Sequence, residues 1–155
     1  MKLRFWIQGA VIAAVYAVVT VVAAPISYGI MQVRVSESMT VLPALTSAGL
    51  PGIFVGCIVA NLLGPYGIID VICGSLASLL GAYGTYKLKD RPFLMLLPPV
   101  IANGIIIGAM LHYAYGVKLN LFLCMSWVAA GEFLACYIIG LPLFYLLRKY
   151  EGIFK

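Results

Sequence analysis

Long apolar runs fill most of this sequence, and they constrain the fold more than any other feature. Hydrophobic residues make up 64% of the 155 residues, whereas charged residues make up only 10%. A soluble domain cannot cover so much apolar surface, so lipid must solvate most of the chain. We therefore expect an all-α membrane protein with a single integral membrane domain over residues 1–155.

The apolar runs predict six transmembrane helices that differ in length. Their approximate ranges are 5–27, 37–46, 53–63, 68–87, 92–115 and 119–147. The second and third helices are shorter than the roughly 20 residues that a full span needs, so we expect them to be tilted, bent or lengthened by their ends. Pro43 bends or ends the second helix, and Ser36 or Ser38 is placed to cap it.

Basic residues at the ends of the apolar runs predict the topology. Six crossings that start inside place the clusters at 2–4, 87–91 and 148–155, and both chain termini, in the cytoplasm, as the positive-inside rule requires. The net charge of +5 therefore reflects topology and not nucleic-acid binding. The outer face gathers the loops 25–38, 64–67 and 113–118, where belt preference predicts an aromatic rim of Tyr28, Tyr66, Tyr113 and Tyr115.

Two polar residues and one tryptophan stand deep inside the apolar runs. Glu132 lies about 20 Å along the last helix, where a carboxyl costs roughly 2.5 kcal/mol or more unless it is paired, protonated or beside water. We favour a ligand role over a protonated structural Glu. Asn103 either satisfies backbone carbonyls near Pro98 and Pro99 or reaches a ligand at a similar depth. Trp127 either packs on lipid or stacks on a flat ligand.

The polar residues near the outer surface also allow two interpretations each. In the stretch 32–40, several polar side chains stand together between apolar runs. Arg34 and Glu37 either pair with each other in solvent or form one wall of an outward-facing small-molecule site. Asp70 is either a helix N-terminal charge or a ligand contact, and Asn61 is either a helix cap or a ligand contact.

Small residues recur at four-residue spacing in the first helix. Gly9, Ala13 and Ala17 form one row, and Ala10 and Ala14 form a parallel one. Such rows let a second helix approach closely in lipid, either from the same chain or from another membrane subunit.

Motifs for catalysis are absent from the sequence. It has neither a Gly-rich phosphate loop ending in Gly-Lys-Ser/Thr nor an HExxH or Ser-His-Asp grouping, so we expect no enzyme activity, no cofactor and no metal site in this chain. We interpret the four cysteines as small packing residues: Cys57, Cys73, Cys124 and Cys136.

An ordered set of short motifs runs through nearly the whole chain: Val33-Arg34-Val35-Ser36-Glu37, Val41-Leu42-Pro43, Pro51-Gly52-Ile53-Phe54-Val55-Gly56-Cys57, Ala60-Asn61-Leu62, Asp70 with Gly74-Ser75-Leu76-Ala77, Pro98-Pro99-Val100-Ile101-Ala102-Asn103 and Gly131-Glu132. With this set the sequence resembles the QueT family. These proteins are substrate-binding S components of energy-coupling factor (ECF) transporters and are associated with queuosine precursors.

The resemblance implies a six-transmembrane-helix bundle typical of ECF S components, in the bacterial cytoplasmic membrane. Such a protein captures a 7-deazaguanine, such as prequeuosine or queuine, from outside. It works with a transmembrane coupling (T) subunit and two ATPase subunits that hydrolyse ATP. An Ala-xxx-Ala pattern contacts the coupling subunit in this group, and it maps onto Ala13 and Ala17 or onto Ala10 and Ala14.

A guanine-like ligand gives the polar residues plausible roles, because its N–H edge suits a carboxylate, its carbonyl suits an amide or guanidinium, and its flat ring suits an aromatic side chain. The expected substrate-binding residues are Glu132, Asn103, Asp70, Asn61, Glu37, Arg34 and Trp127. Two alternatives remain open: an S component for another vitamin-like ligand (a flavin, thiamine or a purine), and a structural or channel subunit.

Overall fold

The computed structural model describes residues 2–27, 33–150 and 152, and every regular element in this part of the chain is helical. Short 3₁₀ segments (η1 and η2) and a π-helical segment (η3) accompany the α-helices. In chain order the elements are α1 (Lys2–Val22), α2 (Ala24–Ser27), η1 (Val35–Ala44), α3 (Gly49–Leu62), α4 (Ile68–Lys87), η2 (Leu94–Leu96), α5 (Leu97–Tyr113), α6 (Leu121–Phe133), η3 (Leu134–Gly140) and α7 (Leu141–Arg148).

Four helices in the described chain are long and apolar enough to cross a membrane: Lys2–Val22, Ile68–Lys87, Leu94–Tyr113 and Leu121–Arg148. Large apolar side chains such as Leu80, Ile105 and Phe122 point outward from them, and lipid is the solvent that suits such a surface. The predicted all-α membrane fold is therefore confirmed. The six crossings stay a prediction, because α3 has 14 residues and η1 has 10.

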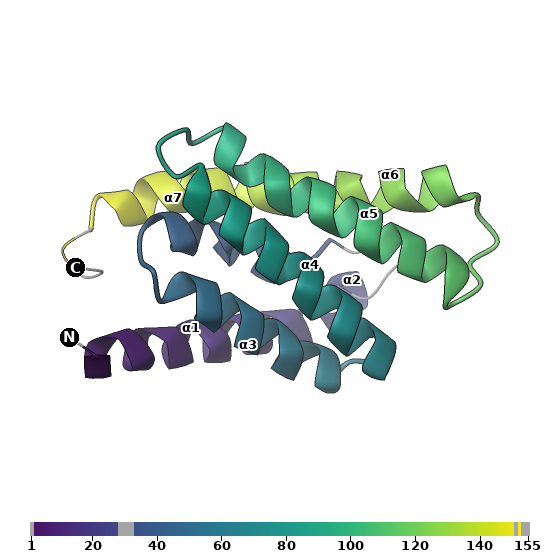
Figure 1. Cartoon of the computed structure of the whole chain (residues 1–155), viewed down its shortest axis with the longest axis horizontal. Helices are drawn as coiled ribbons and strands as arrows, with labels where there is room; N and C mark the ends of the chain where they lie inside the picture. Colours follow the sequence, from purple (N-terminus) through teal and green to yellow (C-terminus); the bar gives the residue numbers. More distant parts are fainter. Residues whose placement is uncertain (1, 28–32, 151, 153–155) are drawn as a thin grey trace.

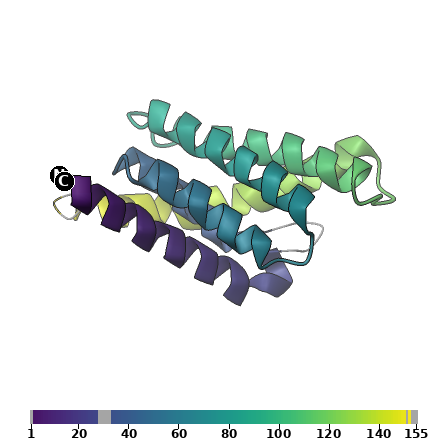
Figure 2. The same ribbon diagram turned by 60° about the horizontal axis from the view of Figure 1, so that its bottom comes forward.

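The helices form a row that curves around η1. Each of α1, α3, α4, α5 and α6 packs on the next one in that order, and the last helix continues through η3 and α7. Figure 1 shows α1 and α3 side by side, α4 crossing the middle of the bundle, and η1 behind α4. Figure 2, turned by 60°, shows the same order of helices. Because η1 also contacts α1, α3, α4 and η3, it is the central element of the bundle.

The two ends of the bundle differ in composition. Both chain termini lie at one end (Figure 1), where Arg4 donates a hydrogen bond of 3.5 Å to the carbonyl of Gly152. We call it the basic end, because the element ends and the α4–η2 loop that meet there carry Lys2, Arg4, Lys87, Lys89, Arg91, Arg148 and Lys149. At the other end, the aromatic end, the Tyr115 hydroxyl donates to the carbonyl of Tyr66 at 2.6 Å, and the two ring centroids lie 5.2 Å apart. Tyr28, expected in this rim, lies outside the described residues.

Glycines set the closest contacts between helices. A Cβ at Gly56 would lie 2.9 Å from the Ala13 carbonyl, so α3 packs directly on the backbone of α1. A Cβ at Gly108 would lie 2.5 Å from the Cα of Met125, so α5 also packs directly on the backbone of α6. These contacts fit the packing of membrane helices, which relies on small residues.

The central segment differs from the helix expected over 37–46. It is a 3₁₀-helix over Val35–Ala44 that includes Pro43, and Arg34 occupies its N-cap position without a side-chain capping bond. Neither Ser36 nor Ser38 caps it. Runs of 3₁₀-helix longer than three or four residues are uncommon, and this one of 10 residues is packed against α1, α3, α4 and η3.

Candidate functional site

A buried polar cluster surrounds the start of η1. Its members come from α1, η1, α3, α4 and the last helix, and all of them are buried. Polar groups withdrawn from water need partners, so such a cluster inside an apolar bundle marks either a binding site or a set of polar contacts that fixes how the helices pack. We call this set the η1 cluster: Tyr16, Thr20, Arg34, Ser36, Glu37, Thr40, Cys57, Asn61, Asp70, Ser78, Glu132 and Cys136.

Arg34 connects the central segment to α3 and α4. Its guanidinium donates a short hydrogen bond to Asn61 Oδ1, and its Nη2 lies 3.7 Å from Asp70 Oδ2. Arg34 is only 2% exposed, so its interpretation as half of a solvent-exposed pair with Glu37 is wrong. Gly74 makes room for this contact, because a Cβ there would collide with the Asn61 amide and lie 3.6 Å from the guanidinium.

Asn61 and Asp70 are brought together across the turn between α3 and α4. The Asn61 amide donates to the Asp70 carbonyl at 3.0 Å, and Leu63, not Asn61, is the C-cap of α3. Asp70 lies in the first turn of α4. This helix begins directly after Gly67, whose φ of 75° favours glycine. Both residues therefore belong to the cluster and are more than helix-end residues.

Glu37 is the centre of the second half of the cluster. Its Oε1 accepts a short hydrogen bond from the Tyr16 hydroxyl and one of 2.6 Å from Ser78 Oγ. Its Oε2 is buried, and no described residue forms a hydrogen bond with it. Glu37 thus has one oxygen fixed by the protein and one still available to accept a hydrogen bond from a ligand.

Glu132 extends the cluster toward the last helix. It is 2% exposed, and its Oε2 lies 3.7 Å from the Cys136 thiol. The same thiol lies 3.7 Å from the Glu37 carbonyl and 3.6 Å from Thr40 Oγ1. These contacts place Glu132 beside η1. Cys136 lies in η3, and π-helical turns frequently occur at functional positions.

Asn103 combines a backbone contact with an unused acceptor. Its Nδ2 donates to the Pro99 carbonyl at 3.2 Å, which is the role expected next to two prolines. Its buried Oδ1 has no hydrogen-bond partner among the described residues. The α5–α6 register, in which Gly104 faces Ala129, sets Asn103 opposite Ala130, about 3 Å along the axis from Glu132. Asn103 therefore lies at the depth that the sequence predicts.

Trp127 does not join the cluster. Its side chain is 43% exposed on the outer surface of α6, which supports the lipid-packing interpretation and not ring stacking on a buried ligand. The sequence could not distinguish these two interpretations, because depth along a helix does not reveal which face of the helix a residue occupies.

Several members of the cluster were not expected from the sequence. They are Tyr16, Thr20, Ser36, Thr40, Cys57, Ser78 and Cys136. The Cys57 thiol lies 3.4 Å from both the Asn61 amide and Ser78 Oγ, so it is more than a packing residue. Cys57 and Asn61 lie one helical turn apart, and this spacing was the sequence signal that could have identified Cys57 as a member of the cluster.

The aromatic end lies next to the Arg34 half of the cluster. Burial makes the largest contribution to the raised pKa of Tyr115, and the nearby Asp70 carboxylate makes the next largest. Tyr115 also donates a hydrogen bond to the carbonyl of Tyr66 in the neighbouring loop. Toward the basic end, apolar side chains pack together beyond the cluster, including Ile12, Met39 and Ile53. The cluster is therefore nearer the aromatic end.

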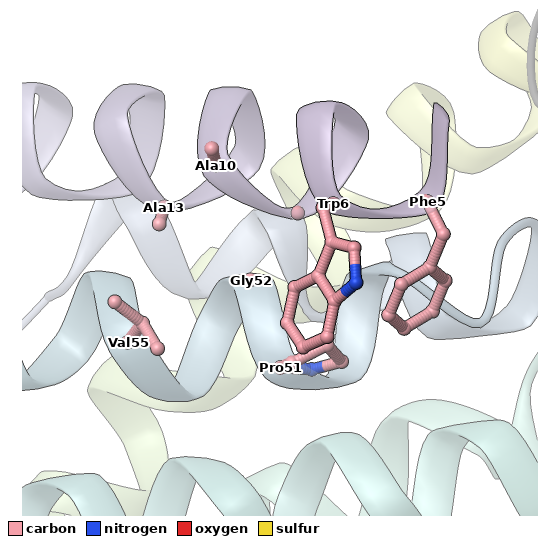
Figure 3. Close-up of a pocket in the computed structure, with 8 residues that line it drawn as sticks. Phe5, Trp6, Ala10, Ala13, Pro51, Gly52 and Val55 are labelled. Atoms are coloured by element: carbon pink, nitrogen blue, oxygen red, sulfur yellow. The ribbon is translucent and has the colours of Figure 1, made fainter. Parts of the chain in front are cut away.

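A separate apolar groove of about 190 Å³ lies between α1 and α3 on the outer surface (Figure 3). The two alanine rows differ there. Ala13 and Ala17 are buried, and the close approach of Gly56 shows that Ala13 contacts α3 of the same chain. Ala10 and Ala14 are exposed. The groove is lined by Phe5, Trp6, Gly9, Ala10, Ala13, Pro51, Gly52 and Val55.

A family model described as QueT transporter matches residues 6–149, which is nearly the whole chain. No curated protein and no solved structure matches the sequence.

Proposed function

The chain belongs to the QueT transporter family and is therefore a membrane transporter component, and we propose that it is the substrate-binding S component of an ECF-type importer. In this proposal it captures a queuosine precursor, a 7-deazaguanine such as prequeuosine or queuine, outside the bacterial cytoplasmic membrane. A T subunit and two ATPase subunits then drive uptake, so ATP hydrolysis belongs to the partners and not to this chain.

The observation that carries this proposal is a pair of unsatisfied buried acceptors, one in the η1 cluster and one on α5. Glu37 Oε2 and Asn103 Oδ1 are buried without a hydrogen-bond partner among the described residues. A buried acceptor without a partner costs roughly 1–3 kcal/mol. A ligand with N–H donors removes this cost, and a structural subunit would leave it unexplained.

A 7-deazaguanine offers the complementary groups. Its N1–H and exocyclic NH₂ are adjacent donors, and Glu37 Oε2 can accept a hydrogen bond from this edge. Its carbonyl oxygen needs a donor, which the Arg34 guanidinium can supply. Asp70 holds Arg34 in place at 3.7 Å.

Ligand binding to the purified protein tests the assignment. Isothermal titration with 7-aminomethyl-7-deazaguanine, 7-cyano-7-deazaguanine and queuine should give saturable binding to at least one compound. Riboflavin, thiamine and guanine serve as the comparison panel. Binding of a panel compound without any 7-deazaguanine would move the protein to another ligand class, and no binding at all would remove the substrate assignment.

Partner docking is assigned to the exposed side of α1. Ala10 lines the α1–α3 groove (Figure 3) and is exposed, as is Ala14 one turn further along α1, whereas Ala13 already contacts α3. A long side chain on the exposed row would keep a partner helix away without disturbing α3.

Copurification tests this docking surface. Ala14→Leu should reduce recovery of co-expressed T and ATPase subunits at least about tenfold and leave ligand binding unchanged. Ala130→Leu, an exposed alanine on α6, is the matched control. Equal recovery with both variants would exclude this side of α1 as the docking surface.

A further inference from the structure

We propose that a groove between α4 and α5 at the basic end binds an anionic phospholipid such as phosphatidylglycerol. One acyl chain lies along the groove, and the phosphate headgroup lies on the basic loop that joins α4 to η2. This site shares no residue with the η1 cluster, so it does not depend on which substrate the protein carries.

The α4–α5 groove is apolar and has a volume of about 430 Å³. The two helices approach closely beside it, because a Cβ at Gly84 would lie only 2.3 Å from the Pro98 Cβ. Longer side chains such as Leu80, Leu94 and Ile101 stand out from this contact and are exposed. The groove is lined by Leu80, Leu88, Leu94, Leu97, Pro98, Ile101 and Ala102.

The length of the groove corresponds to one membrane leaflet. Its lining residues Leu80 and Leu88 are separated by about 12 Å along the axis of α4. Half of a hydrocarbon core of about 30 Å is roughly 15 Å. Further along α4, Ile72 and Leu76 are also exposed but do not line the groove. A groove that follows one leaflet suits an acyl chain better than a helix that crosses the whole membrane.

The loop at the mouth of the groove is basic. Leu88 lines the groove and stands between Lys87 and Lys89, and Arg91 follows in the same loop. All three cations are exposed, and no carboxylate of the described chain forms an ion pair with them. With Asp90 as the one acid among residues 87–91, three positive charges and one negative charge leave a net charge of +2. An anionic headgroup above the groove supplies the missing counter-charge.

Aromatic side chains place the basic loop at the level of lipid headgroups. Lys87 Nζ lies 5.4 Å from the centroid of the Tyr83 ring, and Lys89 Nζ lies 5.4 Å from that of Tyr86. Tyrosine is enriched at the interface between membrane and water. Figure 1 shows the loop at the same end of the bundle as the two chain termini. The two ammonium groups are therefore at the depth of the phosphates of one leaflet.

Hydrogen bonds hold the segment that follows the basic loop in one shape. The Thr85 hydroxyl donates to the Met95 carbonyl at 2.8 Å, and the Tyr137 hydroxyl donates to the Phe93 carbonyl at 2.8 Å. A segment that is already fixed loses little conformational freedom when a ligand binds. This favours one defined lipid site over a diffuse basic surface.

Native mass spectrometry of the purified chain tests lipid binding. The two lipids are phosphatidylglycerol and phosphatidylcholine with identical acyl chains. One phosphatidylglycerol per chain should be retained at a concentration at least about tenfold lower than that needed for phosphatidylcholine. Equal retention of the two lipids overturns the proposal.

Filling the groove tests where the acyl chain lies. Ala102→Phe places a large side chain in the groove without changing any charge, and it should weaken phosphatidylglycerol binding at least about tenfold, because even a few displaced methylene groups lower the affinity that much. Ala130→Phe, at an exposed alanine of α6, is the matched control. Unchanged binding in a folded Ala102→Phe variant, or an equal loss in both variants, overturns the assignment to the groove.

Neutralising the loop tests where the headgroup lies, and it changes exposed residues only, which covers the case that Ala102→Phe does not fold. Lys87→Gln/Lys89→Gln/Arg91→Gln should reduce the preference for phosphatidylglycerol to within about twofold. The control Lys2→Gln/Arg4→Gln/Lys149→Gln makes the same change in charge at the same end, on α1 and after α7, and should keep the preference. An equal loss in the two triple variants shows a diffuse effect of charge and overturns the proposal.

Photo-crosslinking in cells distinguishes a lipid from a protein in the groove. A benzoylphenylalanine in place of Leu94, which lines the groove and is exposed, should give a phospholipid adduct detectable by mass spectrometry. Capture of a second copy of the chain or of a co-expressed subunit, without a lipid adduct, assigns the groove to a protein partner and overturns the proposal.

Discussion

Arg34 and Glu37 stand three residues apart but face different partners. Arg34 contacts Asn61 and Asp70, whereas Glu37 accepts hydrogen bonds from Tyr16 and Ser78. Arg34 precedes η1 in extended backbone, whereas Glu37 lies within the 3₁₀-helix, and the two side chains reach different parts of the cluster. The two side chains therefore connect η1 to α1, α3 and α4.

The ion pair between Arg34 and Asp70 should behave as a buried pair. Arg34→Met leaves the Asp70 carboxylate without its cation, so we expect destabilisation by about 3–5 kcal/mol. The double variant Arg34→Met/Asp70→Asn removes both charges and should recover at least half of this loss. Thermal unfolding in detergent, followed by tryptophan fluorescence, measures the change in stability.

The single variant Asp70→Asn completes the double-mutant cycle. A coupling energy near zero, with the two single losses simply adding, would show that the pair contributes nothing beyond its separate side chains. Ligand titration on the same variants shows whether the double variant is folded but unable to bind.

Sequence alone located the charged members of the site but not their neighbours. Glu132 and Asp70 stand out because a carboxylate inside an apolar run has an unavoidable desolvation cost. Tyr16 and Ser78 do not stand out, because a tyrosine or serine is ordinary in a membrane helix until its partner is known. Trp127 was counted among the expected ligand contacts but faces outward, because a tryptophan suits both a lipid-facing and a ligand-facing position.

At the level of elements, hydropathy predicts long helices well and the central segment poorly. The expected range 68–87 agrees with α4, because Gly67 and the basic turn after Lys87 mark its ends. The range 37–46 did not predict a 3₁₀-helix over Val35–Ala44, since its form depends on neighbours on every side. The π-helical turn over Leu134–Gly140 likewise has no local signal in the sequence.

Contacts between α5 and α6 should be sensitive to a single methyl group. Gly108→Ala would place a Cβ 2.5 Å from the Cα of Met125, and backbone atoms cannot move aside cheaply. We expect destabilisation by about 1–3 kcal/mol, measured by thermal unfolding in detergent.

A helical glycine with more space is the matched control. At Gly9 in α1 the nearest atom to an added Cβ is the Ala48 carbonyl oxygen at 3.6 Å, an ordinary contact. Gly9→Ala should therefore be neutral or stabilising by up to about 1 kcal/mol. Equal losses at both positions would show that close packing of α5 on α6 is not the cause.

At the scale of the whole molecule, the separation of charge between its two ends is consistent with the predicted topology. The clusters at 2–4, 87–91 and 148–149 gather at the basic end, as the sequence predicted for one side of the membrane, while Tyr66 and Tyr115 meet at the other. The positive-inside rule then predicts that the basic end faces the cytoplasm. A ligand captured from outside would reach the η1 cluster from the aromatic end.

Cysteine labelling in intact cells tests this orientation. Lys118→Cys, in the exposed loop at the aromatic end, should react with a membrane-impermeant maleimide added outside, whereas Asp90→Cys, at the basic end, should react only after permeabilisation. The wild-type chain is the control, because Cys57, Cys124 and Cys136 are buried and Cys73 is partly buried. The reverse pattern would place the basic end outside and the η1 cluster near the cytoplasm, which is incompatible with capture from outside. Labelling of both positions in intact cells would contradict an α5 that crosses the membrane between the loops at Asp90 and Lys118.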